Sequence, residues 1–80
     1  MAAKDRKVAF LEGFGHAVRE AREKHGWSQE ELGFEAELDR TYISGIERGV
    51  RNPTLESVHR IASALKVSPS TLVKRAETGA

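Results

Sequence analysis

Two short helical patterns, separated by only a few residues, constrain the fold of this chain more than any other feature. The first is Ser28 to Leu32 and the second runs from Arg40 to Gly49. Ser28 and Glu31 have the spacing of a capping box, in which a hydroxyl and a carboxylate each bond a free amide at a helix start. Asp39 can cap the second helix, and Gly49 can end it in a left-handed conformation. The patterns predict two helices joined by a tight turn.

The second of these helices has two different faces. Ile43, Ile46 and Glu47 share one side at helical spacing. The opposite side carries basic, hydroxyl and small residues: Arg40, Thr41, Ser44, Gly45 and Arg48. An apolar side packs on a core, and an outward side of this chemistry suits the major groove of DNA. These two faces predict a protein that reads a DNA sequence.

The chain has 80 residues, no cysteine and a formal net charge of +1. This length predicts one small domain, residues 1–80, near the lower limit for folding without disulfides or metals. The total charge is too small to indicate a partner, but its distribution is uneven, because an acidic stretch over residues 30–39 precedes Arg40, Arg48 and Arg51. The core must be stable alone or with a second copy of the chain.

Other classes of protein find little support. No long apolar run is present, so we expect neither a membrane segment nor a signal peptide, and a cytoplasmic location. His16, His25 and His59 lack the spacing of a metal site, so we expect no metal. No serine or threonine has an arguable histidine base nearby in the sequence. We therefore expect no enzyme activity, no catalytic residue, no cofactor and no small-molecule ligand.

The remaining pattern is all-helical. A first helix is expected from about Val8 to His25, preceded by a flexible arm over residues 1–8 and weakened by Gly13 and Gly15. Thr54 can cap a fourth helix. Its expected inward residues are Leu55, Val58, Ile61, Ala62 and Leu65. Pro69 at a first helical position predicts a fifth helix over residues 69–76.

Three segments carry a resemblance to a known family: Ser28 to Leu32, Thr41 to Gly49 and Asn52 to Leu55. From about Phe14 to Leu72, the chain resembles helix-turn-helix regulators of the Cro and lambda-repressor type, the xenobiotic-response-element family. Its short length and the run Arg40 to Ser44 are similar to controller proteins of restriction–modification systems. The resemblance implies an all-α, compact five-helix lambda-repressor-like domain with its helix-turn-helix at about residues 28–48.

The resemblance also assigns DNA contacts. The residues that match base-contacting positions are Arg40, Thr41, Ser44 and Gly45. Arginine can bond guanine O6 and N7 together, and a threonine methyl can meet a thymine methyl. The residues that match phosphate-contacting positions are Gln29, Tyr42, Arg48, Arg51 and Asn52. Phosphate contacts position a protein on DNA but carry little sequence information.

Further residues have structural roles by the same resemblance. Arg22 and Glu47 match a partly buried salt bridge between the first and third helices, and Leu72 and Val73 match a two-fold contact on the fifth. Trp27 is expected to pack at the helix junction, and Phe34 to face solvent.

Two positions depart from the family. Glu37 stands where relatives have a turn glycine, so the chain either accepts strain of about 1 kcal/mol or closes the turn differently. Gly33 replaces alanine and is expected to loosen the second helix by about 1 kcal/mol.

The predicted function is that of a homodimeric, autoregulatory transcriptional regulator on a pseudo-palindromic operator. Within that class, the resemblance implies a restriction–modification controller. Its expected partners are double-stranded DNA, a second copy of the chain and, where binding activates transcription, RNA polymerase. The alternative is an antitoxin-like protein-interaction module with the same fold. An exposed apolar patch beyond the dimer contact would favour that alternative, whereas a basic outer face on the second helix of the pair favours DNA.

Overall fold

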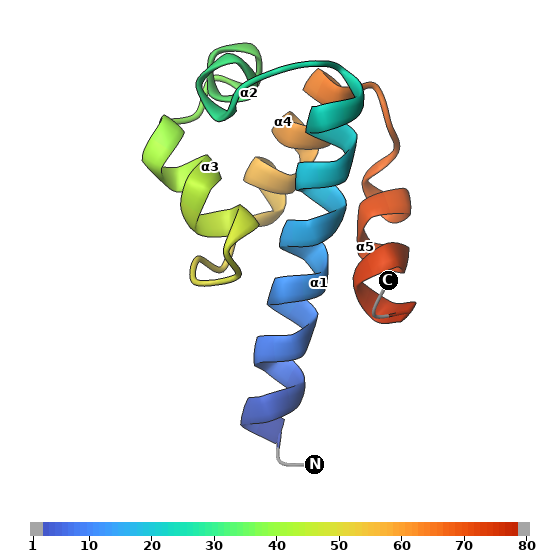
Figure 1. Cartoon of the computed structure of the whole chain (residues 1–80). Coiled ribbons are helices and arrows are strands. Elements are labelled where there is room, and N and C mark those ends of the chain that lie inside the picture. Colours follow the sequence, from blue (N-terminus) through green and yellow to red (C-terminus); the bar gives the residue numbers. More distant parts are fainter. Residues whose placement is uncertain (1–2, 79–80) are drawn as a thin grey trace.

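Five helices follow one another along residues 3–78, the part of the chain that this computed structural model describes. They are α1 (Ala3–Lys24), α2 (Gln29–Ala36), α3 (Arg40–Glu47), α4 (Leu55–Leu65) and α5 (Pro69–Thr78). No strand occurs within these residues. Packing joins α1 to α5 and α3, and α2 to α3 and α4. In Figure 1, α1 forms the long axis of the molecule, with α2 and α3 on one side and α5 on the other. The all-α five-helix prediction is confirmed.

The first helix is longer than the sequence predicts. It begins at Ala3 rather than Val8, and its amino-terminal end extends beyond the other helices (Figure 1). The expected flexible arm over residues 1–8 is therefore wrong for residues 3–8, and residues 1 and 2 lie outside the described residues. The cause is local, because alanine, lysine and arginine favour a helix and nothing before Val8 interrupts one.

Two glycines inside α1 allow neighbouring helices to come close. A Cβ atom on Gly13 would lie 3.1 Å from the carbonyl oxygen of Ala76 in α5. A Cβ on Gly15 would lie 2.5 Å from the carbonyl oxygen of Glu47, at the end of α3. Glycine weakens an isolated helix, but at these positions its missing side chain admits the backbone of another helix. The glycines thus set how α3 and α5 sit on α1.

The predicted start of α2 is confirmed. Ser28 precedes the helix, and its Oγ accepts a hydrogen bond from the Glu31 amide at 3.0 Å. The Ser28 amide donates in return to Glu31 Oε1 at 2.7 Å, which completes the capping box. The boundaries expected for α3 and α4 hold as well, since Asp39 and Thr54 are their cap residues.

The turn between α2 and α3 is closed by a residue in the left-handed region. Glu37 has φ of 58°, so of the two alternatives the chain accepts the strained backbone. The adjacent expectation for Gly33 is wrong. A Cβ there would lie 2.6 Å from the carbonyl oxygen of Leu38, so no methyl group is missing. Gly33 permits a tight return of the chain after α2.

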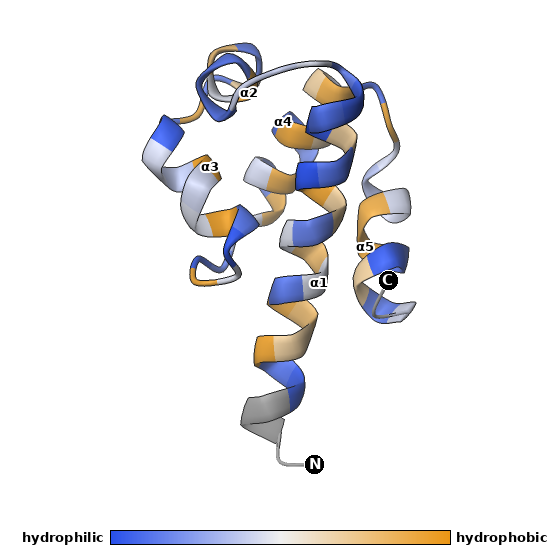
Figure 2. Ribbon diagram, in the orientation of Figure 1, coloured by the Kyte–Doolittle hydropathy of each residue, from blue (hydrophilic) through white to orange (hydrophobic). Residues whose placement is uncertain are grey.

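The core lies around α1 and α4, with the paired helices α2 and α3 packed against them on one side and α5 on the other. Its largest fully buried side chains are Val18, Leu32, Ile43, Ile46, Ile61, Leu65 and Leu72. In Figure 2, apolar residues alternate with polar ones along α1, as expected for a helix with one buried side. Leu55 was expected in this core but is 89% exposed. It is the first residue of α4, and no neighbouring helix covers it there.

Candidate nucleic-acid interface

The position of α3 is set by its cap. Asp39 accepts hydrogen bonds from both the backbone amide of Thr41, at 2.7 Å, and the Thr41 hydroxyl. These bonds to the carboxylate, first the hydroxyl and then the amide, lower the pKa of Asp39 below its usual value. The Thr41 hydroxyl is therefore engaged in the cap, and α3 begins at Arg40.

The outer side of α3 carries three of the predicted contact residues in exposed positions: Arg40, Thr41 and Arg48. Ser44 lies between them and is half-buried. Gly45 differs from the expectation, because it is buried rather than exposed. The exposed position predicted for Gly45 is therefore corrected: the residue is buried, so it offers little surface for the base contact that was expected of it.

Arg51, from the loop after α3, is what covers Gly45. A Cβ on Gly45 would fall well inside van der Waals contact with the Arg51 Cγ, and it would lie 3.5 Å from the Cδ. The Arg51 amide also donates to the Gly45 carbonyl oxygen at 3.2 Å. The guanidinium carbon lies 5.8 Å from the centre of the Tyr42 ring, within the range of a cation–π contact. Arg51 thus lies along the Tyr42–Gly45 edge of α3.

A buried hydrogen-bonded network joins α1, α2 and α3 behind this surface. Arg22 donates to both oxygens of Glu47, from Nε to Oε2 at 2.7 Å and from Nη2 to Oε1 at 3.0 Å. The two side chains are 12% and 3% exposed, so the predicted partly buried pair is present. A third Arg22 bond, from Nη1 to the Trp27 carbonyl oxygen at 2.7 Å, ties in the end of α1. The hydrogen bonds that Arg22 donates to Glu47 raise the pKa of Arg22, so the guanidinium stays charged.

Gln29, at the start of α2, belongs to the same network. Its Nε2 donates to Glu47 Oε1 at 3.0 Å. One amide hydrogen is thereby used inside the protein, and the side chain is half-buried. An open groove lined by Ser28, Gln29, Glu30 and Arg40 lies between the starts of α2 and α3. Free backbone amides at a helix start favour an anion, so this groove suits a phosphate group.

The remaining predicted phosphate contact in the loop, Asn52, is exposed beside Arg51. Trp27 is half-buried against the core and stacks on the His25 ring, with the ring centres 4.3 Å apart. This agrees with a packing role at the helix junction. Phe34 is 82% exposed on α2, as expected.

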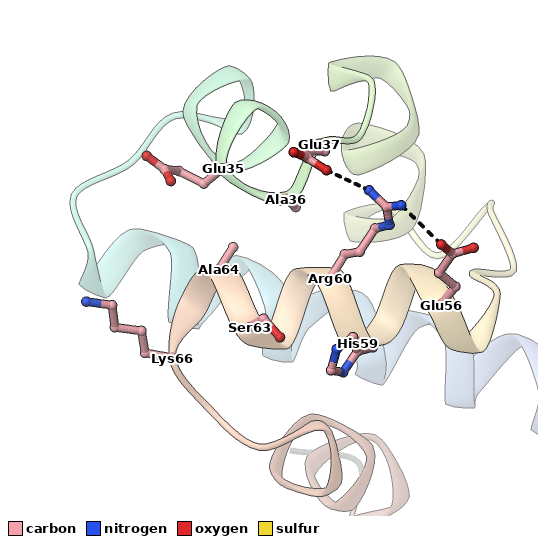
Figure 3. A pocket seen from close by; sticks show the side chains of 9 residues that line it. All are labelled: Glu35, Ala36, Glu37, Glu56, His59, Arg60, Ser63, Ala64 and Lys66. Atoms are coloured by element: carbon pink, nitrogen blue, oxygen red, sulfur yellow. Dashed lines mark hydrogen bonds and ion pairs between the residues drawn. The ribbon is translucent and has the colours of Figure 1, made fainter.

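A second groove, of about 530 Å³, lies between α2 and α4 (Figure 3). Arg60 crosses it and donates to Glu37 Oε1 and to Glu56 Oε2, each at 3.1 Å. These carboxylates raise the pKa of Arg60, Glu56 more than Glu37. The contact links α4 to the strained turn residue. Three of the charged side chains that line this groove, Arg60, Glu37 and Glu56, are therefore paired with one another.

The two residues of α5 that were expected to form the dimer contact differ in exposure. Leu72 is 2% exposed and belongs to the core of the single chain, so its assignment to a two-fold contact is corrected. It faces inward because α5 packs along α1. Val73, the next residue around the helix, is 36% exposed.

The sequence did not predict that the Arg51 side chain packs against α3. The two segments are adjacent in the chain, but only the course of the loop after Gly49, which has φ of 76°, brings Arg51 back over Gly45. A glycine inside an amphipathic helix was the available signal. It indicates a close approach, yet it does not say which residue approaches.

Residues 18–72 match the helix-turn-helix family. The chain belongs to this family. It is 51% identical over 61 residues to the control protein C.BamHI of Bacillus amyloliquefaciens, a match that covers 75% of each protein.

Solved structures agree with this result. The restriction–modification controller protein C.AhdI from Aeromonas hydrophila superposes with a TM-score of 0.76 at 45% identity, over 78% of this chain and 94% of that one. The controller protein C.Esp1396I, solved as a tetramer with its natural 35 base-pair operator, superposes with a TM-score of 0.76 at 36% identity, over 88% of this chain and 92% of that one. The resemblance to controller proteins predicted from the sequence is confirmed.

Two observations concern other kinds of site. Within residues 3–78, no helix is long and apolar enough to cross a membrane. Among the side chains that the structure describes, those of residues 6–78, no three His, Asp or Glu residues gather as a metal ion would require.

Proposed function

We propose that this protein is a sequence-specific DNA-binding transcriptional regulator of the restriction–modification controller type. The observation that carries the proposal is the exposed outer side of α3, where Arg40 and Arg48 form no ion pair with any side chain that the structure describes. The Glu47 network holds the helix from behind. A rigid helix with an exposed basic side is the arrangement that a major groove accepts. We further propose that the protein acts in the cytoplasm, controls its own gene through its concentration and, where it activates, contacts RNA polymerase.

Arg40, Thr41 and Ser44 are the proposed base-contacting residues. Arg40 is exposed at the first turn of α3, where its fork can bond O6 and N7 of one guanine. The Thr41 hydroxyl is engaged by Asp39, which leaves the methyl group as the part of the side chain for a thymine methyl. Ser44 is half-buried, so we propose that it contacts a base where α3 comes closest to the floor of the major groove.

Phosphate contacts are proposed for Gln29, Tyr42, Arg48, Arg51 and Asn52. Gln29 keeps one amide hydrogen beyond the one given to Glu47, and it lines the groove between the starts of α2 and α3. Arg48 ends α3 and is exposed. These contacts would hold α3 in register on the DNA.

The test begins with an operator selected by the parent protein from a random-sequence DNA library. Arg40→Ala should lose about 1–3 kcal/mol on that operator and relax the preference at one base pair. Arg48→Ala should weaken binding to the operator and to random DNA alike. It should also reduce the dependence of the affinity on salt concentration by about one phosphate contact. Arg19→Ala, at an exposed position on α1, is the control. If all three variants bind like the parent, the proposed surface is not the DNA-binding surface.

We propose that the active form is a homodimer joined through α5. One copy of α3 reads few base pairs, whereas two copies related by a two-fold axis read half-sites about one helical turn, or 34 Å, apart. Val73 is exposed on the outer side of α5, beside a shallow groove that also includes Thr71 and Lys74.

Val73→Glu should shift the protein toward monomer and lower its operator affinity although no residue of α3 has changed. Sedimentation equilibrium at micromolar concentration measures the first effect, and DNA titration the second. A parent protein that is monomeric there and still binds one palindromic operator tightly as a single copy would refute the dimer. The interaction-module alternative would then gain, with exposed Phe34 as the residue to examine.

A further inference from the structure

Arg51 belongs to the loop after α3, yet three separate contacts hold it against α3. Its amide donates to the Gly45 carbonyl oxygen at 3.2 Å, and the neighbouring Val50 amide donates to the same oxygen at 3.0 Å. Its aliphatic stem lies over the bare Cα of Gly45. Its guanidinium lies 5.8 Å from the centre of the Tyr42 ring. The backbone, the stem and the charged end are therefore each placed by α3.

We propose that Gly45 and Tyr42 are positioning residues for Arg51, which they hold ready for its contact with a DNA phosphate. The proposal rests on the proposed function, because it concerns how one residue of the DNA-binding surface is prepared. Arginine side chains have many rotamers, and ordering one on binding costs free energy. A side chain that is already placed in the free protein avoids most of that cost.

Gly45 contributes by having no side chain. The atoms nearest to a Cβ at this position all belong to the Arg51 side chain, its Cγ, Cβ and Cδ. An added methyl group would therefore meet no rigid backbone. It would displace a flexible side chain, so the fold would be kept, but Arg51 would no longer be held against α3. In helix formation itself, alanine is better than glycine.

Tyr42 contributes the face of its ring. It precedes Gly45 by three residues and so lies on the same edge of α3. A guanidinium over an aromatic ring is attracted by the ring and keeps its hydrogen-bond donors free at its edge. The edge is then available to a phosphate group, which accepts from arginine in the same plane.

The test is a double-mutant cycle on an operator selected by the parent protein. Gly45→Ala should lower operator affinity about fivefold, the effect of losing one preordered side chain. Its melting temperature should equal or exceed that of the parent. Because the phosphate contact itself can still form, the salt dependence of binding should stay as in the parent. Arg51→Ala should lower both the affinity and the salt slope, the slope by about one contact.

The decisive comparison is Gly45→Ala in the Arg51→Ala background. There the added methyl group should change operator affinity less than about twofold, because the residue that it displaces is gone. Tyr42 is examined in the same way. Tyr42→Phe keeps the ring and Tyr42→Leu removes it, so the leucine variant should bind more weakly than the phenylalanine variant only when Arg51 is present.

Two outcomes would overturn the inference while leaving the proposed function intact. In one, Gly45→Ala binds like the parent. In the other, it loses the same affinity with and without Arg51, which would mean that the methyl group obstructs the DNA directly. A parent protein that selects no operator from the library would instead refute the proposed function, and this inference would fall with it.

Discussion

Replacing Arg22 by alanine should destabilise the protein far more than removal of a surface charge does. The Glu47 side chain is 3% exposed, and among the side chains that the structure describes the substitution leaves it with Gln29 as its one partner. Removing one member of a fully buried ion pair costs about 3–5 kcal/mol. Arg22 retains 12% exposure and water can partly replace it, so we expect the lower end, about 3 kcal/mol.

That loss is large for a domain of this size. Typical stabilities of about 0.05–0.15 kcal/mol per residue give roughly 4–12 kcal/mol for 80 residues. In so small a domain each kcal/mol lowers the melting temperature by about 4–8 °C, so Arg22→Ala should lower it by about 12–24 °C. Thermal melts at one fixed protein concentration measure this, because dimer formation would otherwise add to the apparent stability.

Arg19→Ala on the same helix is the matched control. Arg19 pairs with Glu23 at 3.2 Å, but both side chains are more than half exposed, at 62% and 55%. Such pairs contribute less than about 1 kcal/mol. A second variant separates charge from packing: adding Glu47→Gln to Arg22→Ala removes the unpaired buried charge and should recover about 1 kcal/mol or more. If Arg22→Ala melts within about 2 °C of Arg19→Ala, the network does not stabilise the fold as argued.

Four further variants test the caps and turns. The hydrogen bonds that Asp39 accepts lower its pKa in the folded protein. Its contribution to the stability of the fold is therefore complete above the unfolded pKa of about 3.9, and it is lost as the pH falls through the lower folded value. Asp39→Asn should flatten that part of an acid-unfolding curve. Gly33→Ala should destabilise by about 1–3 kcal/mol, measured by urea unfolding, because its Cβ would meet the Leu38 carbonyl oxygen at 2.6 Å. Glu37→Gly and Lys66→Gly each remove the strain of a non-glycine residue in the left-handed region, so each should stabilise the fold by up to about 1 kcal/mol. The gain should be smaller for Glu37→Gly, because this variant also loses the ion pair with Arg60 in α4. Equal gains would mean that this ion pair does not contribute to stability.

The sequence alone was sufficient for the helices and for most of their boundaries. The starts of α2, α3 and α4 depend on Ser28, Asp39 and Thr54, and each of these caps acts on an amide two or three residues away. Such short-range interactions can be read directly from residue order. The boundary that failed, the start of α1, is the one where no capping signal was used.

The pairing of Arg22 with Glu47 was anticipated in a different way. Twenty-five positions separate the two residues, and nothing in their local sequence connects them. Their pairing was inferred from family resemblance, and the structure supplies what resemblance did not, namely the additional bonds of Gln29 and of the Trp27 carbonyl group.

Only the tertiary structure decided which of these residues are covered by other parts of the chain. Helical spacing placed Gly45 on the outside and could not distinguish Leu72 from Val73 as a surface residue, yet Arg51 covers Gly45 and α1 covers Leu72. Gly33 was taken to loosen α2, but the returning backbone at Leu38 fills the space. Periodicity states how residues are arranged around one helix axis. Exposure also depends on segments that arrive from elsewhere in the chain, and their paths are set by the packing of the whole core.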